Sequence, residues 1–300
     1  RLWERGELAS RVQEAVRRLA SCDLCPRGCN ADRLHDERGK CRTGRLAVVS
    51  SYGPHFGEEA PLVGRAGSGT IFFANCNLTC VFCQNHEISH GGEGVAMEAG
   101  QLARIMVSLQ NRGCHNVNLV SPTHVVAQIL EAVLLAVGMG LRIPLVYNTG
   151  GYDSVETLRL LDGVVDIYMP DMKYSDDRVA RSLSGIPQYV GVNRAAVKEM
   201  HRQVGDLVLD DRGIAVRGLL IRHLVLPEGL AGTEGVASFL GEEISRESYV
   251  NVMDQYRPCF RARNHPSLGR RISREEFRQA VESMKAAGIT RLDDRQLLSI

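Results

Sequence analysis

The sequence predicts an α/β fold in which short strands alternate with helices along the middle of the chain. Six apolar runs of strand length occur between residues 70 and 253, and amphipathic helical patterns separate them. Such alternation is typical of βαβ units and a parallel sheet. The segment is shorter than the roughly 250 residues of an eight-stranded barrel. Either an open six-stranded barrel or a doubly wound sheet is therefore expected.

Each element can be placed along the chain. The predicted strands are residues 70–74, 117–121, 144–149, 164–170, 218–227 and 248–253. Residues 207–216 predict a hairpin inserted before the fifth strand, with its turn at Asp-Asp-Arg-Gly. Residues 4–20 carry the apolar stripe of an amphipathic helix, whereas the Gly- and Pro-rich residues 51–69 predict a structured loop. Residues 273–287 predict a C-terminal helix that starts with a capping box.

The chain divides into three expected parts. Residues 1–66 comprise the N-terminal helix, a cysteine-rich metal-binding segment and a loop. Residues 67–260 form the unit of alternating strands and helices, and residues 261–300 form a C-terminal helical extension. No internal repeat or low-complexity tract is visible in the sequence.

The composition is that of an ordinary globular protein and argues against some partners. The chain has 300 residues, is 44% hydrophobic and has a net charge of +1. This balance gives no basis for broad binding of nucleic acid or of an anionic membrane. The most apolar stretch, residues 132–141, is shorter than the roughly 20 residues that span a bilayer. The first residues are charged and show no secretory signal, so we expect a cytoplasmic protein.

Nine cysteines are the unusual feature, because most of them are clustered. The N-terminal cysteine group is Cys22, Cys25, Cys29 and Cys41, and the three-cysteine loop contains Cys76, Cys80 and Cys83. In a reducing compartment, cysteines at such spacing bind metal more often than they form disulfides. An odd total also fits poorly with a fully paired disulfide framework. Metal binding is therefore the leading class of function.

The three-cysteine loop follows directly on the first predicted strand. A [4Fe–4S] cluster normally takes four thiolates, so a cluster held by this loop would have one iron without a cysteine. A chelating small molecule could bind to that iron and be reduced there. The location fits, because functional loops of α/β sheets lie at the carboxyl ends of strands. The alternative is a structural zinc ion with His86 as its fourth ligand.

The cysteine spacing resembles that of a known family. Cys-x3-Cys-x2-Cys at the end of a first strand is the signature of radical S-adenosylmethionine (SAM) enzymes. The stretch from Gly69 to Asn85 resembles pyruvate formate-lyase activating enzymes, and more closely their uncharacterised homologues with cysteines near the N-terminus. The resemblance extends from Cys22 to about Pro258. It favours a partial (βα)6 TIM-like barrel with an N-terminal cysteine-rich extension and a C-terminal helix.

The resemblance also implies a mechanism. The open iron would chelate the amino and carboxylate groups of SAM, and one electron from the cluster would cleave the sulfonium C–S bond. The products would be methionine and a 5′-deoxyadenosyl radical that abstracts hydrogen from a substrate, such as a protein glycyl residue or a peptide. The electron would come from a flavodoxin- or ferredoxin-like donor. The protein itself would position groups and exclude water.

Polar residues that follow the second and third strands are candidates for SAM binding. Ser121 and Thr123 lie where many radical SAM enzymes have a Gly-Gly-Glu-Pro-like motif that binds the SAM amine, and this sequence departs from that motif. Capping of the next helix is an equally good explanation of both residues. Asn148 and Thr149 resemble part of the Asp-Thr-Asn-Gly segment of the activating enzymes.

Charged residues follow the fourth strand and interrupt the fifth. Asp171 and Lys173 match the Asp-x-Lys that the family associates with the SAM site, and residues two apart on a strand share a face. A surface ion pair is the alternative. Arg222 lies within an apolar run, so its charge must be paired or must face a polar cavity. It matches the arginine that contacts the SAM carboxylate in the family.

The N-terminal cysteine group supplies four thiolates within a loop-rich segment. Either zinc or a complete second [4Fe–4S] cluster would satisfy them. Arg27, Arg33 and Arg42 would offset their negative charge. Such a site has no vacant position, so its role would be structural or in electron transfer. Relatives with additional clusters favour an iron–sulfur cluster over zinc.

Two features leave alternatives open. The loop between the two cysteine groups contains His55, Glu58 and Glu59, and it either closes over the barrel mouth or is a solvated turn. The function is either that of a radical SAM enzyme or that of a non-catalytic iron–sulfur or zinc protein for electron transfer or assembly.

Overall fold

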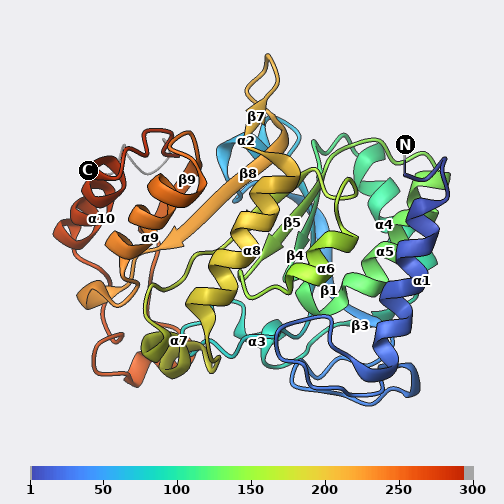
Figure 1. Ribbon diagram of the computed structural model, residues 1–300, viewed down its shortest axis with the longest axis horizontal. Coiled ribbons are helices and arrows are strands. Elements are labelled where there is room, and N and C mark those ends of the chain that lie inside the picture. The colour runs from blue at the N-terminus through green and yellow to red at the C-terminus, as the bar shows by residue number, and fades with distance from the viewer. Residues whose placement is uncertain (1, 294–300) are drawn as a thin grey trace.

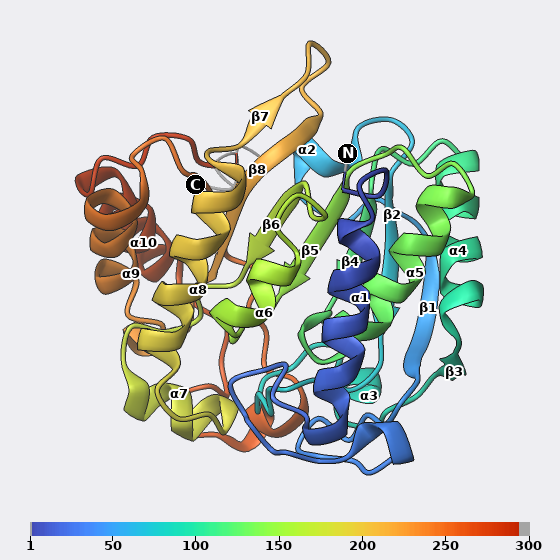
Figure 2. The same ribbon diagram turned by 45° about the vertical axis from the view of Figure 1, so that its right-hand side comes forward.

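The fold is built on a curved sheet, shown in a computed structural model that describes residues 2–293 (Figure 1). Its strands lie in the order β3–β1–β2–β4–β5–β6–β8–β7, with β9 paired to β8. Figure 2 shows helices lying along the outer side of the sheet. None of the helices in residues 2–293 combines the length and the apolar character needed to cross a membrane.

Six strands of the sheet run parallel and correspond in order to the six predicted strands. They are β2 (Ser68–Phe73), β4 (Val117–Val120), β5 (Leu145–Thr149), β6 (Ile167–Pro170), β8 (Ala215–Leu224) and β9 (Tyr249–Met253). Each pairs with the next. Within the described residues β2 and β9 do not pair with each other, so the barrel stays open. The predicted α/β fold with a partial (βα)6 barrel is confirmed.

Helices connect the parallel strands and bury their apolar faces. These helices are α4 (Ala99–Asn111), α5 (Val126–Gly138), α6 (Val155–Leu160), α8 (Tyr189–Val204) and α9 (Thr233–Phe239). In α5, Ile129, Leu130 and Val133 are buried, as expected of a stripe at helical spacing. The helices therefore lie where the apolar periodicity predicts them.

Shorter elements complete the connections. They are α2 (Ala60–Val63), α3 (His86–Ser89), α7 (Asp177–Ser184), β3 (Val95–Met97) and β7 (Val208–Leu209). β7 pairs antiparallel with the start of β8 and forms the predicted hairpin. Single turns of 3-10 helix lie at Arg18–Ser21, Arg33–His35, Thr123–Val125, Pro227–Gly229 and Phe260–Asn264, and a π-helical turn at Leu240–Ile244.

One expectation was wrong, because the first part of residues 51–69 is not a loop. It belongs to β1 (Ala47–His55), which pairs antiparallel with β2 and, at its start, with β3. Gly53 and Pro54 weaken the strand signal in the sequence. They are tolerated because this half of β1 pairs only with β2, and a strand edge does not need every N–H donor.

The two ends of the chain agree with prediction in part. The N-terminal helix α1 (Glu7–Arg17) is shorter than residues 4–20 and packs against α5. The C-terminal helix α10 (Arg274–Ala286) has the predicted capping box, in which Glu276 N–H donates to Ser273 Oγ at 3.1 Å. Residues 294–300 of the expected extension lie outside the described residues. The boundaries at residues 66 and 260 stay predictions.

Candidate functional site

The carboxyl ends of the parallel strands surround a cavity of about 550 Å³. Its lining joins residues from the three-cysteine loop, from the ends of the parallel strands and from the segment after β1. The expected residues that line it are Cys76, Cys80, Cys83, Ser121, Asn148, Thr149, Asp171, Lys173 and Arg222. Thr123, which was also expected at the SAM site, does not line this cavity.

The sulfurs of the three-cysteine loop have polar neighbours from other elements. Cys80 Sγ lies 2.9 Å from the hydroxyl of Ser184, at the end of α7. Cys83 Sγ lies 3.0 Å from the hydroxyl of Ser89, at the end of α3. Hydroxyl donors of this kind stabilise a metal-bound thiolate and tune its potential. The helices α3 and α7 therefore hold hydroxyl groups against these two sulfurs.

The protonation of the thiols matters for metal binding. Burial raises the pKa of Cys76 to about 12, although the Leu78 backbone N–H lies 3.4 Å from its sulfur and opposes the rise. Burial also raises the pKa of Cys80. Thiols with raised pKa values ionise when a metal takes the place of the proton, so metal binding would release protons here.

The donor set fits an iron–sulfur cluster better than zinc. His86, the expected fourth zinc ligand, stacks on the Phe260 ring with 5.0 Å between centroids and does not line the cavity. In residues 2–293 no three His, Cys, Asp or Glu side chains are grouped as the ligands of one ion would be. A cluster binds each thiolate through a different iron, so its ligands need not converge on one point.

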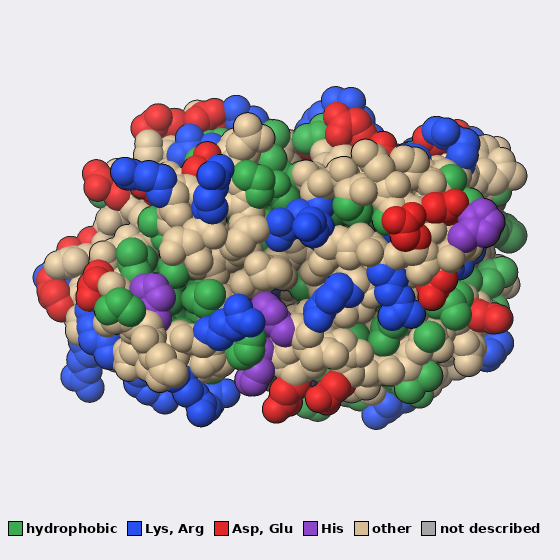
Figure 3. Space-filling view, turned by 90° about the horizontal axis from the view of Figure 1, so that it is seen from below, with side chains coloured by type: hydrophobic (Ala, Val, Ile, Leu, Met, Phe, Trp, Pro, Cys, Tyr) green, Lys and Arg blue, Asp and Glu red, His purple; other side chains and the backbone are tan. Residues whose placement is uncertain are grey.

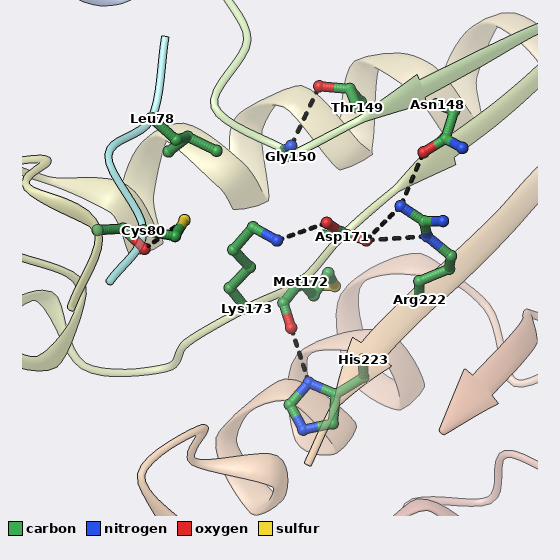
Figure 4. A network of polar contacts seen from close by, with 12 residues as sticks. Leu78, Cys80, Asn148, Thr149, Gly150, Asp171, Met172, Lys173, Arg222 and His223 are labelled. Atoms are coloured by element: carbon green, nitrogen blue, oxygen red, sulfur yellow. Dashed lines mark hydrogen bonds and ion pairs between the residues drawn. The ribbon is translucent and has the colours of Figure 1, made fainter. Parts of the chain in front are cut away.

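Beside the cysteines, four side chains from neighbouring strands form a charged network (Figure 4). Lys173 Nζ lies 2.5 Å from one carboxylate oxygen of Asp171, and Arg222 Nε donates to the other at 2.9 Å. Arg222 Nη2 also donates to Asn148 Oδ1 at 2.7 Å. The Asp171 and Lys173 side chains are 13% and 15% exposed, so this is not the surface ion pair of the alternative interpretation.

Electrostatics leave this network with surplus positive charge. Burial alone would raise the pKa of Asp171, but the charges of Arg222 and Lys173 outweigh burial and lower it. The Asp171 carboxylate in turn outweighs burial and raises the pKa of Lys173. Two cations therefore share one anion at the cavity wall. Such a wall attracts a carboxylate or another anionic group.

Ser121 and Thr123 do not cap a helix, because neither the 3-10 turn nor α5 has a side-chain cap. Ser121 lines the cavity and has a left-handed backbone with φ of 57°. Thr123 lies behind it, where its hydroxyl donates to Asp153 at 2.7 Å and lies 3.0 Å from the Thr149 hydroxyl. Thr123 thus supports Thr149 from behind instead of lining the cavity.

Asp153 is a residue that sequence reasoning missed. It is fully buried near the end of β5, and burial raises its pKa. Its carboxylate accepts hydrogen bonds from the hydroxyls of Thr149 at 2.7 Å and Tyr147 at 3.0 Å, besides that of Thr123. The only sequence signal was an acidic residue shortly after a strand end. Asp153 holds the end of β5 in place next to the cavity.

The turn after β5 requires glycine. Gly151 has φ of +77°, and an added Cβ would lie 2.2 Å from the Asp171 carbonyl oxygen. We expect Gly151→Ala to lower the free energy of unfolding by more than about 1 kcal/mol. Gly191 in α8 is the matched control, because a Cβ there meets nothing within 4 Å, and its replacement by Ala should stabilise by about 0.5–1 kcal/mol. Urea denaturation of both variants measures the difference, and equal effects would contradict it.

The N-terminal cysteine group is gathered in space. Burial raises the pKa of Cys25 to about 12, and the nearby thiols of Cys41, Cys22 and Cys29 add to the rise. All nine cysteines are free. Four thiols are the donor set of a zinc site or a closed [4Fe–4S] cluster, although within residues 2–293 these cysteines are not grouped as the ligands of one ion would be either.

Arg33 adds a structural observation in favour of a metal at the N-terminal cysteine group. Its side chain is 1% exposed, and Nη1 lies 3.6 Å from Cys22 Sγ. Nη1 also donates to the His124 carbonyl oxygen, but Nη2 is buried and has no partner in the part of the chain that the structure describes. A buried guanidinium beside the sulfurs fits a metal–thiolate centre with net negative charge.

Arg27 and Arg42 connect the N-terminal segment to the three-cysteine loop, a role that the sequence did not reveal. Arg27 donates to the carbonyl oxygen of Asn77 at 2.8 Å. Arg42 donates to the carbonyl oxygen of Ser89 at 2.6 Å, beside the hydroxyl that contacts Cys83. The two cysteine-containing segments therefore pack directly against each other.

The loop with His55, Glu58 and Glu59 lines the cavity, but it does not close over the barrel mouth. β1 runs antiparallel to β2, so His55 pairs with Ser68 at the start of β2. The loop therefore lies near the amino ends of the parallel strands, opposite the three-cysteine loop. The alternative of a solvated turn is also wrong for the glutamates, since both are buried.

A model of the radical SAM superfamily matches residues 70–205. An uncharacterised protein of Methanocaldococcus jannaschii, MJ0674, is 33% identical over 282 residues, which cover 91% of this chain and 76% of that protein. The sequence match thus includes most of the N-terminal segment as well as the barrel.

Solved structures give weaker matches. A radical SAM methyltransferase from Sphaerobacter thermophilus is 17% identical, with a TM-score of 0.49, over 73% of this chain and 64% of that chain. A domain of a pyruvate-formate lyase-activating enzyme from Bacteroides vulgatus is 15% identical, with a TM-score of 0.36, over 63% of this chain and 87% of that chain. The chain spans less than two thirds of the methyltransferase.

Proposed function

Because the chain belongs to the radical SAM superfamily, we propose that it cleaves SAM reductively at a [4Fe–4S] cluster bound by Cys76, Cys80 and Cys83. When bound, the cluster supplies the electron that splits SAM into methionine and a 5′-deoxyadenosyl radical, which abstracts hydrogen from the substrate. One observation carries the proposal: the three thiols and the positively charged network line the same cavity. A non-catalytic metal centre would not require that arrangement.

The chain's own residues would bind and orient SAM. Arg222 is fixed by Asp171 and Asn148, so its guanidinium is held ready for the SAM carboxylate without a large loss of side-chain freedom. Lys173 adds positive charge on the side of Cys80 (Figure 4). Ser121 also lines the cavity, whereas the Thr149 hydroxyl already donates to Asp153 and accepts from the Gly151 N–H. The buried surroundings would exclude water from a reactive radical.

The substrate and the electron donor are part of the proposal. Hydrogen would be taken from a protein glycyl residue or a peptide, in a cytoplasmic setting with a flavodoxin- or ferredoxin-like donor. On the face where the N-terminal loops and α3 lie, Lys and Arg side chains are interspersed with Asp and Glu side chains (Figure 3).

Anaerobic reconstitution tests the proposed function. The protein is loaded with iron and sulfide, reduced with dithionite and incubated with SAM, and 5′-deoxyadenosine is measured by mass spectrometry. We expect 5′-deoxyadenosine and methionine to form in equal amounts. A fully reconstituted and reduced protein that leaves SAM intact would instead be a non-catalytic iron–sulfur or zinc protein.

We also propose a second [4Fe–4S] cluster at the N-terminal cysteine group. The intact protein should then contain about eight irons per chain, and the Cys25→Ala, Cys29→Ala double variant about four. If the group binds zinc, the intact protein should contain about four irons and one zinc, with the zinc lost in the double variant. Elemental analysis distinguishes the two metals.

Cys114→Ala, Cys259→Ala is the matched control for this metal count. Both cysteines are buried, and neither lines the cavity. The Cys259 thiol donates a hydrogen bond to the Phe82 carbonyl oxygen at 3.1 Å, so it has a partner without a metal. The control should retain all bound metal. A metal content that the Cys25→Ala, Cys29→Ala variant leaves unchanged would contradict any metal at the N-terminal group.

A further inference from the structure

The end of the cavity opposite the three-cysteine loop has its own polar lining. We call it the cavity floor, and it consists of His55, Glu58, Glu59, Asn251 and Asp293. These residues come from the end of β1 and the segment after it, from β9 and from the chain after α10. Asn251 is the register partner of Arg222 in the pairing of β8 with β9, so the floor adjoins the charged network and is available to a second molecule beside SAM.

Two acceptor atoms on the cavity floor lack partners. Asn251 Nδ2 donates to Glu59 Oε1 at 2.9 Å, which joins β9 to the segment after β1 across the open side of the barrel. Within the described residues, Glu59 Oε2 and Asn251 Oδ1 are buried and have no hydrogen-bond partner, and the two residues are 6% and 7% exposed. Buried acceptors without partners are rare and point to a missing donor.

The charge on the cavity floor is negative. Glu58, Glu59 and Asp293 all line the floor. Among the described residues that line the cavity, the Lys and Arg side chains are those of Lys173 and Arg222. Both of these cations are hydrogen-bonded to Asp171, and the charges of Glu59 and Glu58 also act on Arg222. Burial raises the pKa of Glu59, and the charge of Arg222 offsets this only in part. A positively charged donor would therefore gain more here than a neutral one.

An aromatic wall adds to this preference. Phe72 lines the cavity, and its ring packs edge-on against the His55 imidazole with 5.7 Å between centroids. The His55 ring is held by a 2.9 Å contact between its Nδ1 and Glu58 Oε1. The face of a phenyl ring attracts a cation. Carboxylate, carboxamide and ring together resemble the partners of an ammonium or guanidinium group.

We propose that the cavity floor binds a positively charged nitrogen group of the substrate, an ammonium or a guanidinium, through Glu59 Oε2 and Asn251 Oδ1. This inference rests on the proposed function, because it assigns the floor to the molecule that loses hydrogen. The substrate is then an amine or guanidine, either as a small molecule or as a lysine or arginine side chain of a peptide. An ammonium has three donors, enough to satisfy both unpartnered oxygens and one further acceptor.

Calorimetric titration of the reconstituted, unreduced protein tests this proposal. The probes are n-butylammonium, a capped Gly-Lys-Gly peptide and, as the neutral control, 1-butanol. We expect n-butylammonium, the peptide or both to bind, and 1-butanol to bind at least about tenfold more weakly than the cationic probe. Binding of n-butylammonium indicates a small-molecule amine, whereas binding of the peptide alone indicates a lysine side chain.

Three variants locate the binding. Glu59→Gln keeps the side-chain shape but removes the charge, and it should weaken binding of the cationic probe at least about tenfold. Glu59→Asp keeps the charge with a shorter reach and should bind with intermediate affinity. Glu93→Gln alters an exposed glutamate that does not line the cavity, and it should match the wild type. Thermal unfolding shows which variants are folded.

The outcomes separate this inference from the proposed function. Cationic probes that bind no better than 1-butanol, or equally well to the wild type and a folded Glu59 variant, would overturn the inference. Should Glu59→Gln fail to fold, the comparison of Glu59→Asp with the wild type still decides. The titration requires no electron transfer, so a wild type that binds the amine but cannot cleave SAM would contradict only the proposed function.

Discussion

Cys80→Ala should abolish SAM cleavage. The variant leaves two thiolates at the three-cysteine loop for a cluster that already lacks one of its usual four. Loss of a residue that merely supports a metal ligand costs about 10–100-fold in affinity or activity, so loss of a ligand should cost more than about 100-fold. Mass spectrometry of 5′-deoxyadenosine measures the loss, and Cys76→Ala and Cys83→Ala should behave in the same way.

Cys114→Ala is the matched control for Cys80→Ala. Cys114 is as buried as Cys80, but it lies in the turn after α4 and does not line the cavity. Its replacement should leave both the visible absorbance of the cluster and the rate of SAM cleavage close to those of the wild type. A Cys80→Ala protein that retained the absorbance and the activity would show that the cluster is held elsewhere.

Asp171→Asn should destabilise the protein strongly. The carboxylate is shared by Lys173 and Arg222 in a largely buried network, and the variant leaves both cations without their anion. Removal of one partner from a buried ion pair costs about 3–5 kcal/mol. The free energy of unfolding, measured anaerobically by urea denaturation, should fall by this amount. SAM affinity should fall as well, because Arg222 loses the contact that orients it.

The control and the pH dependence sharpen this prediction. Asp176→Asn removes the charge from an exposed pair with Arg178 but keeps the side-chain oxygen that caps α7, so stability should hardly change.

The pKa of Asp171 is lowered in the folded protein, so the stabilisation by its carboxylate is complete above the usual Asp pKa of about 3.9. The contribution is lost as the pH falls through the lowered value. Wild type and Asp171→Asn should therefore converge in acid, and equal stabilities at pH 7 would contradict the account.

The parallel part of the fold could be predicted because its signal is local. Strands buried on both faces appear as short apolar runs, and each run is followed by a helix with its own apolar stripe. β1 gave no such signal, since most of it is only partly buried and it contains Gly53 and Pro54. β1 is held in the sheet by its pairing with β2, and the sequence of β1 alone does not reveal that pairing. The direction of β1, which carries His55 to the amino ends of the strands, is equally invisible in the sequence.

The candidate site was predictable where charge appears in an apolar context. Asp171, Lys173 and Arg222 stand out beside or within buried strands, and the structure brings all three together. Ser184 and Asp153 were missed for a different reason. Ser184 ends a short helix and Asp153 lies in a loop, and the contact between Cys80 and Ser184 joins residues 104 positions apart. Only the folded chain shows which of these residues meet.

Iron-57 Mössbauer spectroscopy tests most directly whether the three-cysteine loop holds a cluster with one open iron. The Cys25→Ala, Cys29→Ala variant is the suitable protein, because its remaining iron would belong to that loop alone. Addition of SAM should change the signal of about one quarter of the iron, the iron without a cysteine ligand. A spectrum that SAM leaves unchanged, in protein that retains about four irons per chain, would contradict the account.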